Sequence, residues 1–598
     1  MLMKKEIQKF FKGEVENDEK TIVKYSRDAS IFEVRPKLVL FPKDSEDVKN
    51  LVKWISENKD KYQDPELNKD WKNLSITSRC AGTDMSGGAI GESLILDFTR
   101  HMNKLIRFNI PEKSSISSNF SSLRPSRSTE WDPRERKIER DYAFITVQPG
   151  MLYRDFEKVT LEKGLILPCY TASKDLNAMG GMFGNNSAGE RTLKYGQTQN
   201  YILETKVVFS DGNEYTVKSS TQNELAKKIS QLNFEGKVYK NIYNLINENK
   251  EEIKQAKPRV RKNSAGYYIW NVASESNFDL NKLLVGSQGT LGITTEITFK
   301  LMPDFKYSKL VVVFMNDLAP LGRLVDEILE LNPETLEAYD DKTVKLAVRF
   351  FWDFLKNKGF LGMVKFLWNF LPEFKMIISG GVPKLILLAE FAGNDISAVN
   401  KQCISLQEKI KKFKLKVHIT KSETESGKYW NIRRESFTLL RKHIKGLHTA
   451  PFIDDIIVRP EFLPKFIPEL NNILNRYNLT YTIAGHAGDG NFHIIPLMDF
   501  SSAGTPNMIM ELGELVYDLV LKYHGSITAE HNDGIIRTPY LKKMYGEKIV
   551  QIFKEVKGIF DPKNIFNPGK KVASSDGGGT KEYILSHIAL EHKVDHKV

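Results

Sequence analysis

The feature that most constrains this chain is a glycine-rich stretch at residues 79–88, with the sequence Arg-Cys-Ala-Gly-Thr-Asp-Met-Ser-Gly-Gly. It lies between two β-type runs, at residues 74–77 and 94–96, and is therefore predicted to form a tight loop with inward-pointing backbone N–H groups. The glycines permit close approach of a ligand to the backbone, and the hydroxyls of Thr83 and Ser86 add donors. The stretch has the features of a loop that binds phosphate oxygens.

Two further small-residue loops follow the first. One covers residues 177–189 and is followed by Tyr195 and Gly196, and the other covers residues 286–293. A single glycine-rich turn between strands is common, and most such turns hold no ligand. Three of them, each leading into or out of a β-rich run, favour a long, flat, polyanionic ligand held between backbone segments.

The composition is that of a folded globular protein with two or three domains, because the chain has 598 residues of which 41% are hydrophobic. The net charge is +12 and the pI is about 9.1. A basic protein of this kind has three classes of candidate partner: nucleic acid, an anionic membrane surface and acidic small molecules. The charge is spread along the chain without an Arg/Lys–aromatic motif, so no nucleic-acid partner is expected.

The three cysteines, Cys80, Cys169 and Cys403, are far apart in the sequence and form no Cys-x-x-Cys motif. They exclude an iron–sulfur cluster or a cysteine-rich zinc site within the chain and favour a reducing compartment. The N-terminus lacks the apolar core of a signal peptide, and the sequence has no run of about 18 uncharged apolar residues. A cytoplasmic protein that does not span a membrane is expected.

The sequence pattern predicts three folded parts. The first ends near residue 302 and carries a Ser-, Arg-, Glu- and Pro-rich segment at residues 111–140, expected to be a mobile surface insertion. Residues 303–505 mix strands with long helices, as in an α+β domain. Residues 506–572 have a mainly helical pattern, and residues 573–598 form a polar tail.

Residues 342–384 interrupt the α+β domain with aromatic and basic side chains. One interpretation is a pair of helices that packs on this domain. The other is a helix that lies on a membrane surface, because Trp and Phe beside Lys is the composition of an interfacial anchor. The sequence leaves both interpretations open.

A histidine-containing constellation occupies residues 485–493, with His486 and His493 on either side of Gly488-Asp489-Gly490. Residues seven apart fall on opposite faces of a regular strand, so a kink at these glycines is expected to bring both rings to one point. A later stretch supplies Glu530 beside His531, whose side chains diverge if the segment is extended. Each histidine taken singly is explained as a hydrogen-bonded structural residue, but two His and one Glu match a catalytic metal site with open positions.

A third element is the run Trp430-Asn431-Ile432-Arg433-Arg434. Paired arginines in a helix usually decorate a solvated face. They also suit a planar, bidentate clamp for a carboxylate, which a lysine does not match. Both interpretations stay open for each arginine.

These motifs, in this order, resemble the FAD-linked oxidases and dehydrogenases of the vanillyl-alcohol-oxidase type, and within them the D-2-hydroxyacid dehydrogenases. The resemblance covers nearly the whole chain, from residues 25–30 to residues 566–570. It implies an α+β fold in which a two-subdomain, PCMH-type FAD-binding domain at residues 1–302 precedes an α+β substrate (cap) domain at 303–505 and a helical C-terminal region at 506–572 that completes the active site. By resemblance, the residues that bind FAD are Arg79, Ala81, Gly82, Thr83, Asp84, Ser86, Gly87, Gly88, Asn177, Met179, Gly180, Gly181, Gly184, Asn185, Asn186, Gly189, Gly289, Gly292, Ile293 and Asn567.

The resemblance also implies oxidation of a small 2-hydroxy acid (lactate, glycolate or 2-hydroxyglutarate class) with hydride transfer to FAD. It assigns His486, His493 and Glu530 as ligands of a divalent metal (zinc, iron or manganese), and His531 as the general base. Arg433 is assigned as the substrate-carboxylate clamp, with Arg434 as the alternative. One departure is Ile495, where the 2-hydroxyglutarate subgroup has an Asn, and this puts the longer diacid substrate in doubt.

Other cofactors and functions fit less well. The chain has no Gly-x-Gly-x-x-Gly fingerprint for a nicotinamide cofactor, and the first loop has no His for covalent attachment of FAD, so a dissociable flavin is expected. Alkyl-dihydroxyacetone-phosphate synthases, a rival in the same superfamily, carry a run of histidines where this chain has Glu530-His531-Asn532. The second rival is a non-catalytic electron-transfer subunit, disfavoured by the intact His and Arg motifs. The expected electron acceptor is a quinone, a flavoprotein or a separate iron–sulfur subunit, and the interfacial reading of 342–384 implies peripheral contact with the inner membrane surface.

Overall fold

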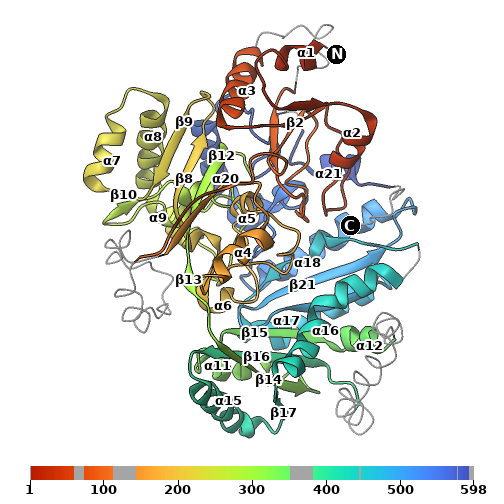
Figure 1. Cartoon of the computed structure of the whole chain (residues 1–598). Coiled ribbons are helices and arrows are strands. Elements are labelled where there is room, and N and C mark those ends of the chain that lie inside the picture. Colours follow the sequence, from red (N-terminus) through yellow and green to blue (C-terminus); the bar gives the residue numbers. More distant parts are fainter. Residues whose placement is uncertain are drawn as a thin grey trace.

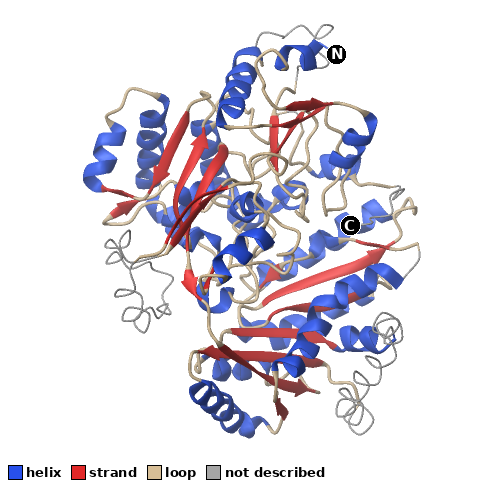
Figure 2. Cartoon of the chain, viewed as in Figure 1, coloured by secondary structure: helices blue, strands red, loops and turns tan. Residues whose placement is uncertain are grey.

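The computed structural model describes residues 2–59, 73–111, 143–349, 381–443, 446–575 and 577–590. Most of the two segments predicted to be insertions, residues 111–140 and 342–384, lies outside the described residues. Figure 1 shows two sheets side by side in the upper part of the molecule and a third, larger sheet below them. The strands of all three sheets are accompanied by helices (Figure 2).

The first sheet has the strand order β1-β2-β4-β3. Its strands are β1 (Glu14–Glu16), β2 (Leu38–Phe41), β3 (Ile76–Arg79) and β4 (Leu94–Asp97), and β2, β4 and β3 run parallel. Helix α3 (Ser45–Asn58) covers the sheet, beginning after Asp44, whose side chain accepts a hydrogen bond from the backbone N–H of Asp47. Its Val48, Leu51, Val52 and Ile55 are buried, at the three- and four-residue spacing of one helical face. Helices α1 (Leu2–Ile7) and α2 (Glu19–Tyr25) complete this part.

The second sheet is antiparallel, in the order β5-β6-β12-β8-β9. Its strands are β5 (Leu105–Asn109), β6 (Phe144–Val147), β8 (Ile202–Val208), β9 (Glu214–Lys218) and β12 (Ile293–Lys300). A hairpin turn after residue 208 joins β8 to β9, and Gly212 adopts a φ of 75° in this turn. The helices between these strands are α4 (Tyr153–Leu161), α5 (Met179–Asn185), α6 (Thr192–Tyr195), α7 (Gln222–Ile229), α8 (Phe234–Glu248), α9 (Lys250–Ala256) and α10 (Asn281–Leu284).

The chain then passes into an antiparallel third sheet, ordered β17-β14-β16-β15-β20-β21-β18, with β19 paired to β21. Its strands are β14 (Tyr307–Met315), β15 (Thr335–Asp340), β16 (Leu385–Gly393), β17 (Lys416–Ile419), β18 (His448–Thr449), β19 (Ile456–Ile457), β20 (Thr480–His486) and β21 (Asn491–Met498). Helices α11 (Leu321–Leu329), α15 (Ile396–Ile410), α17 (Leu463–Asn475) and α18 (Thr505–Lys522) cover one face. The other face packs against α12 (Asp341–Arg349) and α16 (Glu423–His443).

Both faces of this sheet are buried for a reason visible in the sequence. In β14, Val311 and Val313 pack into the core under α11 and α15, and Leu310 and Val312 pack on the opposite side. A strand with apolar side chains on both faces needs a covering layer on each. The face towards α16 is the one that turns to the glycine loops.

The C-terminal region returns to the first two sheets. After α18 come α19 (Gly534–Arg537), the long α20 (Leu541–Phe560) and α21 (Lys581–His587). Phe566 forms a parallel bridge with Ile76 of β3, which adds a strand-like segment to the first sheet. The segment expected to be a polar tail contains α21, whose Ile584 is fully buried, and Ile588 bridges Phe32 near the N-terminus.

Candidate active site

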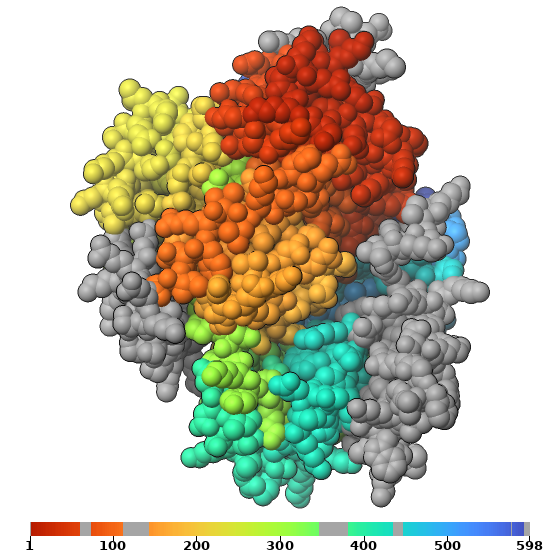
Figure 3. Space-filling model, in the orientation of Figure 1, coloured from red at the N-terminus to blue at the C-terminus, as the bar shows by residue number. Residues whose placement is uncertain are grey.

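The three glycine loops meet at one cavity of about 370 Å³. The loops are hydrogen-bonded to one another: the backbone N–H of Gln288 donates to the carbonyl of Gly184, and the Gln288 side-chain amide lies 3.1 Å from Oδ2 of Asp84. In the space-filling view, the orange surface of residues 150–200 lies directly against the green and teal surface of the third-sheet part (Figure 3). The cavity continues to that part, where it is lined by Arg433, Arg434, Asp454, His486, His493, Ile495, Glu530 and His531.

Most residues that the sequence assigns to FAD line this cavity. They are Arg79, Ala81, Gly82, Thr83, Asp84, Gly88, Asn177, Gly180, Gly181, Gly184, Asn185, Gly289 and Gly292. The others lie behind the lining: Ser86, Gly87, Met179, Asn186, Gly189, Ile293 and Asn567. Asn567 is fully buried, and its amide donates to the carbonyls of Gly88 and Gln288 while its Oδ1 accepts from Thr77. It therefore ties the first loop to the third from outside the cavity.

The glycines divide into those that face open space and those that are packed. A Cβ added to Gly181 would meet no heavy atom within 4 Å, and one added to Gly184 would meet only the Cα of Gln288 at 4.0 Å. At Gly88 the same atom would lie 2.2 Å from the Gln288 side-chain nitrogen. Gly181 and Gly184 thus leave room for a ligand, which fits a flat cofactor threaded past the N-terminal turn of α5.

The two predicted histidines lie on one face of a β-hairpin. His486 ends β20 and His493 lies in β21, with His493 opposite Ala484 and His486 opposite Asn491 in the antiparallel register. The kink expected within a single strand is wrong, because residues 487–490 form a complete reversal in which Gly490 has a φ of 77°. Side chains opposite one another across a hairpin point to the same side, and so do side chains two residues apart in one strand. His493 therefore lies on the same face as Ala484, opposite it, and as His486, two residues further along β20.

Three donor atoms converge at this point. Nε2 of His486 lies 3.3 Å from Oε1 of Glu530, Nε2 of His493 lies 3.4 Å from the same oxygen, and the two nitrogens are 3.4 Å apart. Two ligands of one tetrahedral ion at about 2.0–2.1 Å from each are separated by about 3.4 Å. The three atoms are therefore spaced like three ligands of a single four-coordinate metal.

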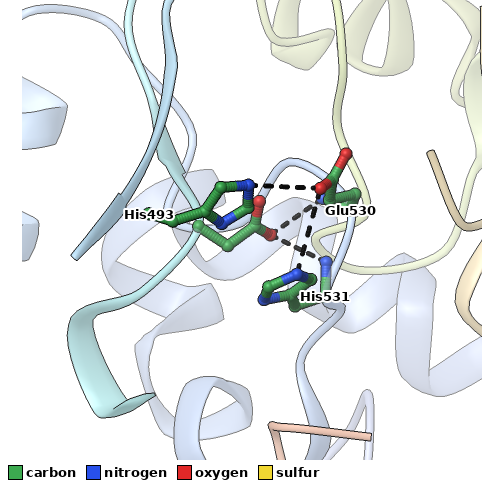
Figure 4. A group of neighbouring side chains, drawn as sticks. His493, Glu530 and His531 are labelled. Atoms are coloured by element: carbon green, nitrogen blue, oxygen red, sulfur yellow. Dashed lines mark hydrogen bonds and ion pairs between the residues drawn. The ribbon is translucent and has the colours of Figure 1, made fainter. Parts of the chain in front are cut away.

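Figure 4 shows His493, Glu530 and His531 pointing towards one another. Nδ1 of His531 lies 2.8 Å from Oδ2 of Asp454, and its Nε2 lies 3.9 Å from Oε1 of Glu530. The rings of His493 and His531 stack with their centroids 5.1 Å apart. Glu530 and His531 thus share one site, in contrast to the separate sites expected from an extended segment.

The carboxylates around the cluster favour protonation of His493 and His531. Burial lowers the pKa of His493, but Asp454 and Glu530 outweigh it and raise that pKa to about 10. Burial likewise opposes protonation of His531, yet Asp455 and Asp454 raise its pKa. For the Glu530 carboxyl, burial raises the pKa, but Lys262 and His486 lower it well below the usual range.

Both predicted arginines reach the cavity, and each contacts a carboxylate. Arg433, on the buried side of α16, places Nη2 3.1 Å from Oε2 of Glu337. The other oxygen of Glu337 lies 2.6 Å from Nδ1 of His486. Arg434 pairs with Glu190 and leaves 45% of its side chain exposed, so it lies nearer the surface.

Three acidic residues that the sequence reasoning missed hold this site together. Glu337 comes from β15, and Asp454 and Asp455 lie between the apolar residues 451–453 and β19. Asp455 Oδ2 accepts hydrogen bonds from the backbone N–H groups of Ala529, Glu530 and His531 and from the Thr528 hydroxyl. Asp455 lies close enough to the cluster to be a ligand, but these four donors occupy it. The sequence feature that could have identified Asp454 and Asp455 is that these two acids are adjacent within an otherwise apolar run.

The charge of this buried group suits a divalent cation. Five carboxylates gather here, and three permanent cations face them, so two negative charges remain while the histidines are neutral. The carboxylates are Glu337, Asp454, Asp455, Asp489 and Glu530, and the cations are Lys262, Arg433 and Arg537. Buried charges in proteins are paired or coordinate metals.

Glycine loops that leave room for a polyanionic cofactor and a cluster of His and Glu side chains thus line one cavity. Two family models match the sequence: the C-terminal domain of FAD linked oxidases at residues 305–571, and an FAD binding domain at residues 133–218. The chain belongs to the FAD-linked oxidase family.

Curated relatives agree with this assignment. The chain is 23% identical over 596 residues to D-2-hydroxyglutarate dehydrogenase of Haemophilus influenzae. The matched region covers 97% of this chain and 52% of the relative. It is 24% identical to glycolate oxidase subunit GlcD of Bacillus subtilis, with 92% of each chain covered. The chain thus spans about half the length of the first relative and nearly all of the second.

The solved structure of p-cresol methylhydroxylase with substrate bound superimposes with a TM-score of 0.62 over 94% of both chains, at 15% identity. This confirms the predicted PCMH-type fold. Among the described residues, no helix combines the length and apolarity needed to cross a bilayer.

Proposed function

We propose that the chain oxidises a small D-2-hydroxy acid to the 2-oxo acid, with FAD as hydride acceptor and a divalent metal in the site. One observation carries the proposal: His486, His493 and Glu530 converge to within 3.4 Å of one another at the end of the cavity that the glycine loops line. The names of the relatives, D-2-hydroxyglutarate dehydrogenase and glycolate oxidase, support the same substrate class.

When bound, FAD supplies a two-electron acceptor for the hydride that leaves the carbinol carbon. A divalent ion held by His486, His493 and Glu530 supplies Lewis acidity that lowers the pKa of the substrate hydroxyl. The residues of the chain do the rest. Arg433 binds the substrate carboxylate through its planar guanidinium, and His531 accepts the hydroxyl proton.

The contacts of His531 favour Nε2 as the atom that accepts the proton. Its Nδ1 faces Asp454 at 2.8 Å, which leaves Nε2 directed towards the cluster. Asp455 and Asp454 raise the pKa of the free imidazole, in spite of its burial. A bound divalent cation opposes these carboxylates and favours the neutral ring that a general base requires.

The cavity favours a short substrate. Ile495 follows His493 by two residues in β21, so the alternation of the strand places both on one face, and Ile495 lines the cavity. An apolar side chain there offers no partner for a second carboxylate. We therefore favour lactate- or glycolate-like acids over 2-hydroxyglutarate, and a quinone, flavoprotein or separate iron–sulfur subunit as the electron acceptor.

Anaerobic mixing of the FAD-loaded protein with a panel of D- and L-2-hydroxy acids tests the proposal. Bleaching of the flavin by a short D-acid, and not by its L-enantiomer, is the expected result. A flavin that no member of the panel reduces would contradict it. If 2-hydroxyglutarate reduced the flavin faster than lactate or glycolate, the preference for a short substrate would be contradicted, but not the reaction type.

A further inference from the structure

Two buried carboxylates, Glu337 and Asp454, occupy equivalent positions around the histidine cluster. Glu337 places Oε1 2.6 Å from Nδ1 of His486 and Oε2 3.1 Å from Nη2 of Arg433. Asp454 places Oδ1 3.2 Å from Nδ1 of His493 and Oδ2 2.8 Å from Nδ1 of His531. Each carboxylate therefore joins one metal-ligand histidine to one residue that handles the substrate.

We propose that Glu337 and Asp454 are paired positioning residues, which couple occupancy of the metal site to the placement of the carboxylate clamp and of the base, respectively. The inference rests on the proposed function. It adds two residues that act through the side chains they hold: Glu337 lies behind the cavity lining, and Asp454 faces the Nδ1 atoms of His493 and His531.

The geometry assigns the tautomers that the neutral rings adopt when they bind a metal. A carboxylate at Nδ1 favours the proton on that nitrogen, so neutral His486 and His493 present an unprotonated Nε2 to the point where the three donors converge. The same contact from Asp454 turns Nε2 of His531 towards Glu530. One carboxylate thus sets the orientation of a ligand and of the base together.

The supports of both carboxylates are rigid. Glu337 lies in β15, between β16 and β20 in the sheet, and is 1% exposed. Asp454 is fully buried, and its own backbone carbonyl accepts a hydrogen bond from Nη2 of Arg537 at 2.7 Å. Carboxylates fixed in this way transmit a displacement of a ring to the partner at their other oxygen.

The two residues have different partners, so their substitution has different consequences. Glu337→Gln keeps the size of the side chain but removes the charge that orients His486 and Arg433. Asp454→Asn does the same for His493 and His531. Both variants should bind Mn²⁺ or Zn²⁺ about 10–100-fold more weakly than wild type. Glu337→Gln should mainly raise KM through Arg433, and Asp454→Asn should mainly lower the rate of flavin reduction through His531.

The experiment titrates chelator-treated, FAD-loaded protein with Mn²⁺ or Zn²⁺ by calorimetry and normalises affinity to the flavin content, so that misfolded protein is not counted. Co²⁺ absorption spectra of each variant report a change in the ligand field, which a purely structural role would leave unchanged. Glu334→Gln is the matched control. Glu334 precedes β15, is fully buried and pairs with Lys194 at 2.7 Å. Its metal affinity and Co²⁺ spectrum should match those of wild type.

Wild-type metal affinity in either variant would overturn the inference, and so would the same KM and rate changes in both variants. Equal weakening by Glu334→Gln would also overturn it, because any buried carboxylate would then have the effect. A wild-type protein that binds metal but reduces its flavin with no hydroxy acid refutes the proposed reaction, and the metal titrations still decide the positioning role. A wild-type protein with no metal affinity refutes the metal site itself.

Discussion

The two residues proposed to handle the substrate differ in what they contact, and so their substitutions should differ in kinetic effect. His531 has Nε2 directed to the cluster, while Arg433 is tied to Glu337. His531→Ala should lower the rate of flavin reduction about 10²–10⁴-fold with little change in KM, because it removes the proton acceptor. Rapid-mixing absorbance of the flavin measures this rate.

Arg433→Lys is the companion variant. A point charge cannot replace a bidentate guanidinium, so KM should rise more than the reduction rate falls. If His531→Ala changes mainly KM and Arg433→Lys mainly the rate, the two assigned roles are exchanged.

Gly181 lines the cavity at a point where an added side chain would meet no other protein atom. Gly181→Glu should abolish FAD binding, because a carboxylate would project into the space that the polyanionic cofactor needs. Flavin absorbance per protein after purification and after incubation with FAD measures the effect. Gly558→Glu, in α20, is the control: its Cβ also meets nothing within 4 Å, but Gly558 lies on the exposed side of its helix. Full flavin content in Gly181→Glu would contradict the assigned cavity.

Gly88, which is buried against the third loop, should behave differently. A Cβ at Gly88 collides with the Gln288 amide, so Gly88→Ala should disturb the contact between the first and third loops rather than fill the cavity. We expect weaker FAD binding together with lower thermal stability. A loss of flavin without any loss of stability would contradict this reason.

At the scale of elements, the segment that carries Glu530 and His531 has no regular secondary structure and depends on Asp455. This carboxylate accepts three backbone N–H groups of residues 529–531, and Asp455 itself has a φ of 65°, which Asn tolerates. Asp455→Asn should therefore keep the backbone conformation and weaken the hydrogen bonds. Because each hydrogen bond to a charged group contributes about 1.5–3 kcal/mol, the free energy of unfolding should fall by about 2 kcal/mol or more.

Urea unfolding measures this loss, and metal titration of the same variant should show weaker binding. Asp499→Asn provides the control, since Asp499 is an exposed residue that accepts hydrogen bonds from Ser501 only locally. Unchanged metal affinity in Asp455→Asn would contradict the view that this carboxylate holds the segment in place.

At the scale of the whole molecule, binding of the proposed metal should displace protons from the histidine cluster. The pKa of His493 in the metal-free protein is about 10, because Asp454 and Glu530 outweigh the effect of burial. At about pH 7.5 this ring is protonated, and a metal can bind only when the proton leaves. We expect release of about one proton per ion from His493, with a further contribution from His531. A pH indicator in weakly buffered solution measures it, and binding without proton release would contradict the ligand assignment.

The same shift makes the stability of the chelated protein depend on pH. The folded-state pKa of His493 lies above its ordinary value of 6.5, so the folded state binds the proton more tightly. This contribution to stability is complete below about pH 6.5 and is lost as the pH rises towards 10. Thermal unfolding of chelated protein should therefore move to lower temperature over this range, and less so with metal bound. A flat profile for the chelated protein would contradict this.

The sequence by itself determined the parts of this protein whose chemistry is local. Glycine-rich runs between apolar segments identify the three loops, and the buried spacing of α3 follows from the helical periodicity of its apolar residues. The residue types His486, His493 and Glu530 suggested a metal site because few other functions need that donor set. The family resemblance, now confirmed, added the order of the domains.

Only the tertiary structure decided which atoms meet. Glu337 and His486 are 149 positions apart, and Asp454 and His531 are 77 apart; the register of β15 against β20 and the folding of the C-terminal region onto the third sheet bring them together. The same long-range packing placed Gly181 at the open cavity and Gly88 against Gln288, although both belong to similar loops. Such contacts depend on the pairing of distant segments, which leaves no periodic signal in the sequence around each residue.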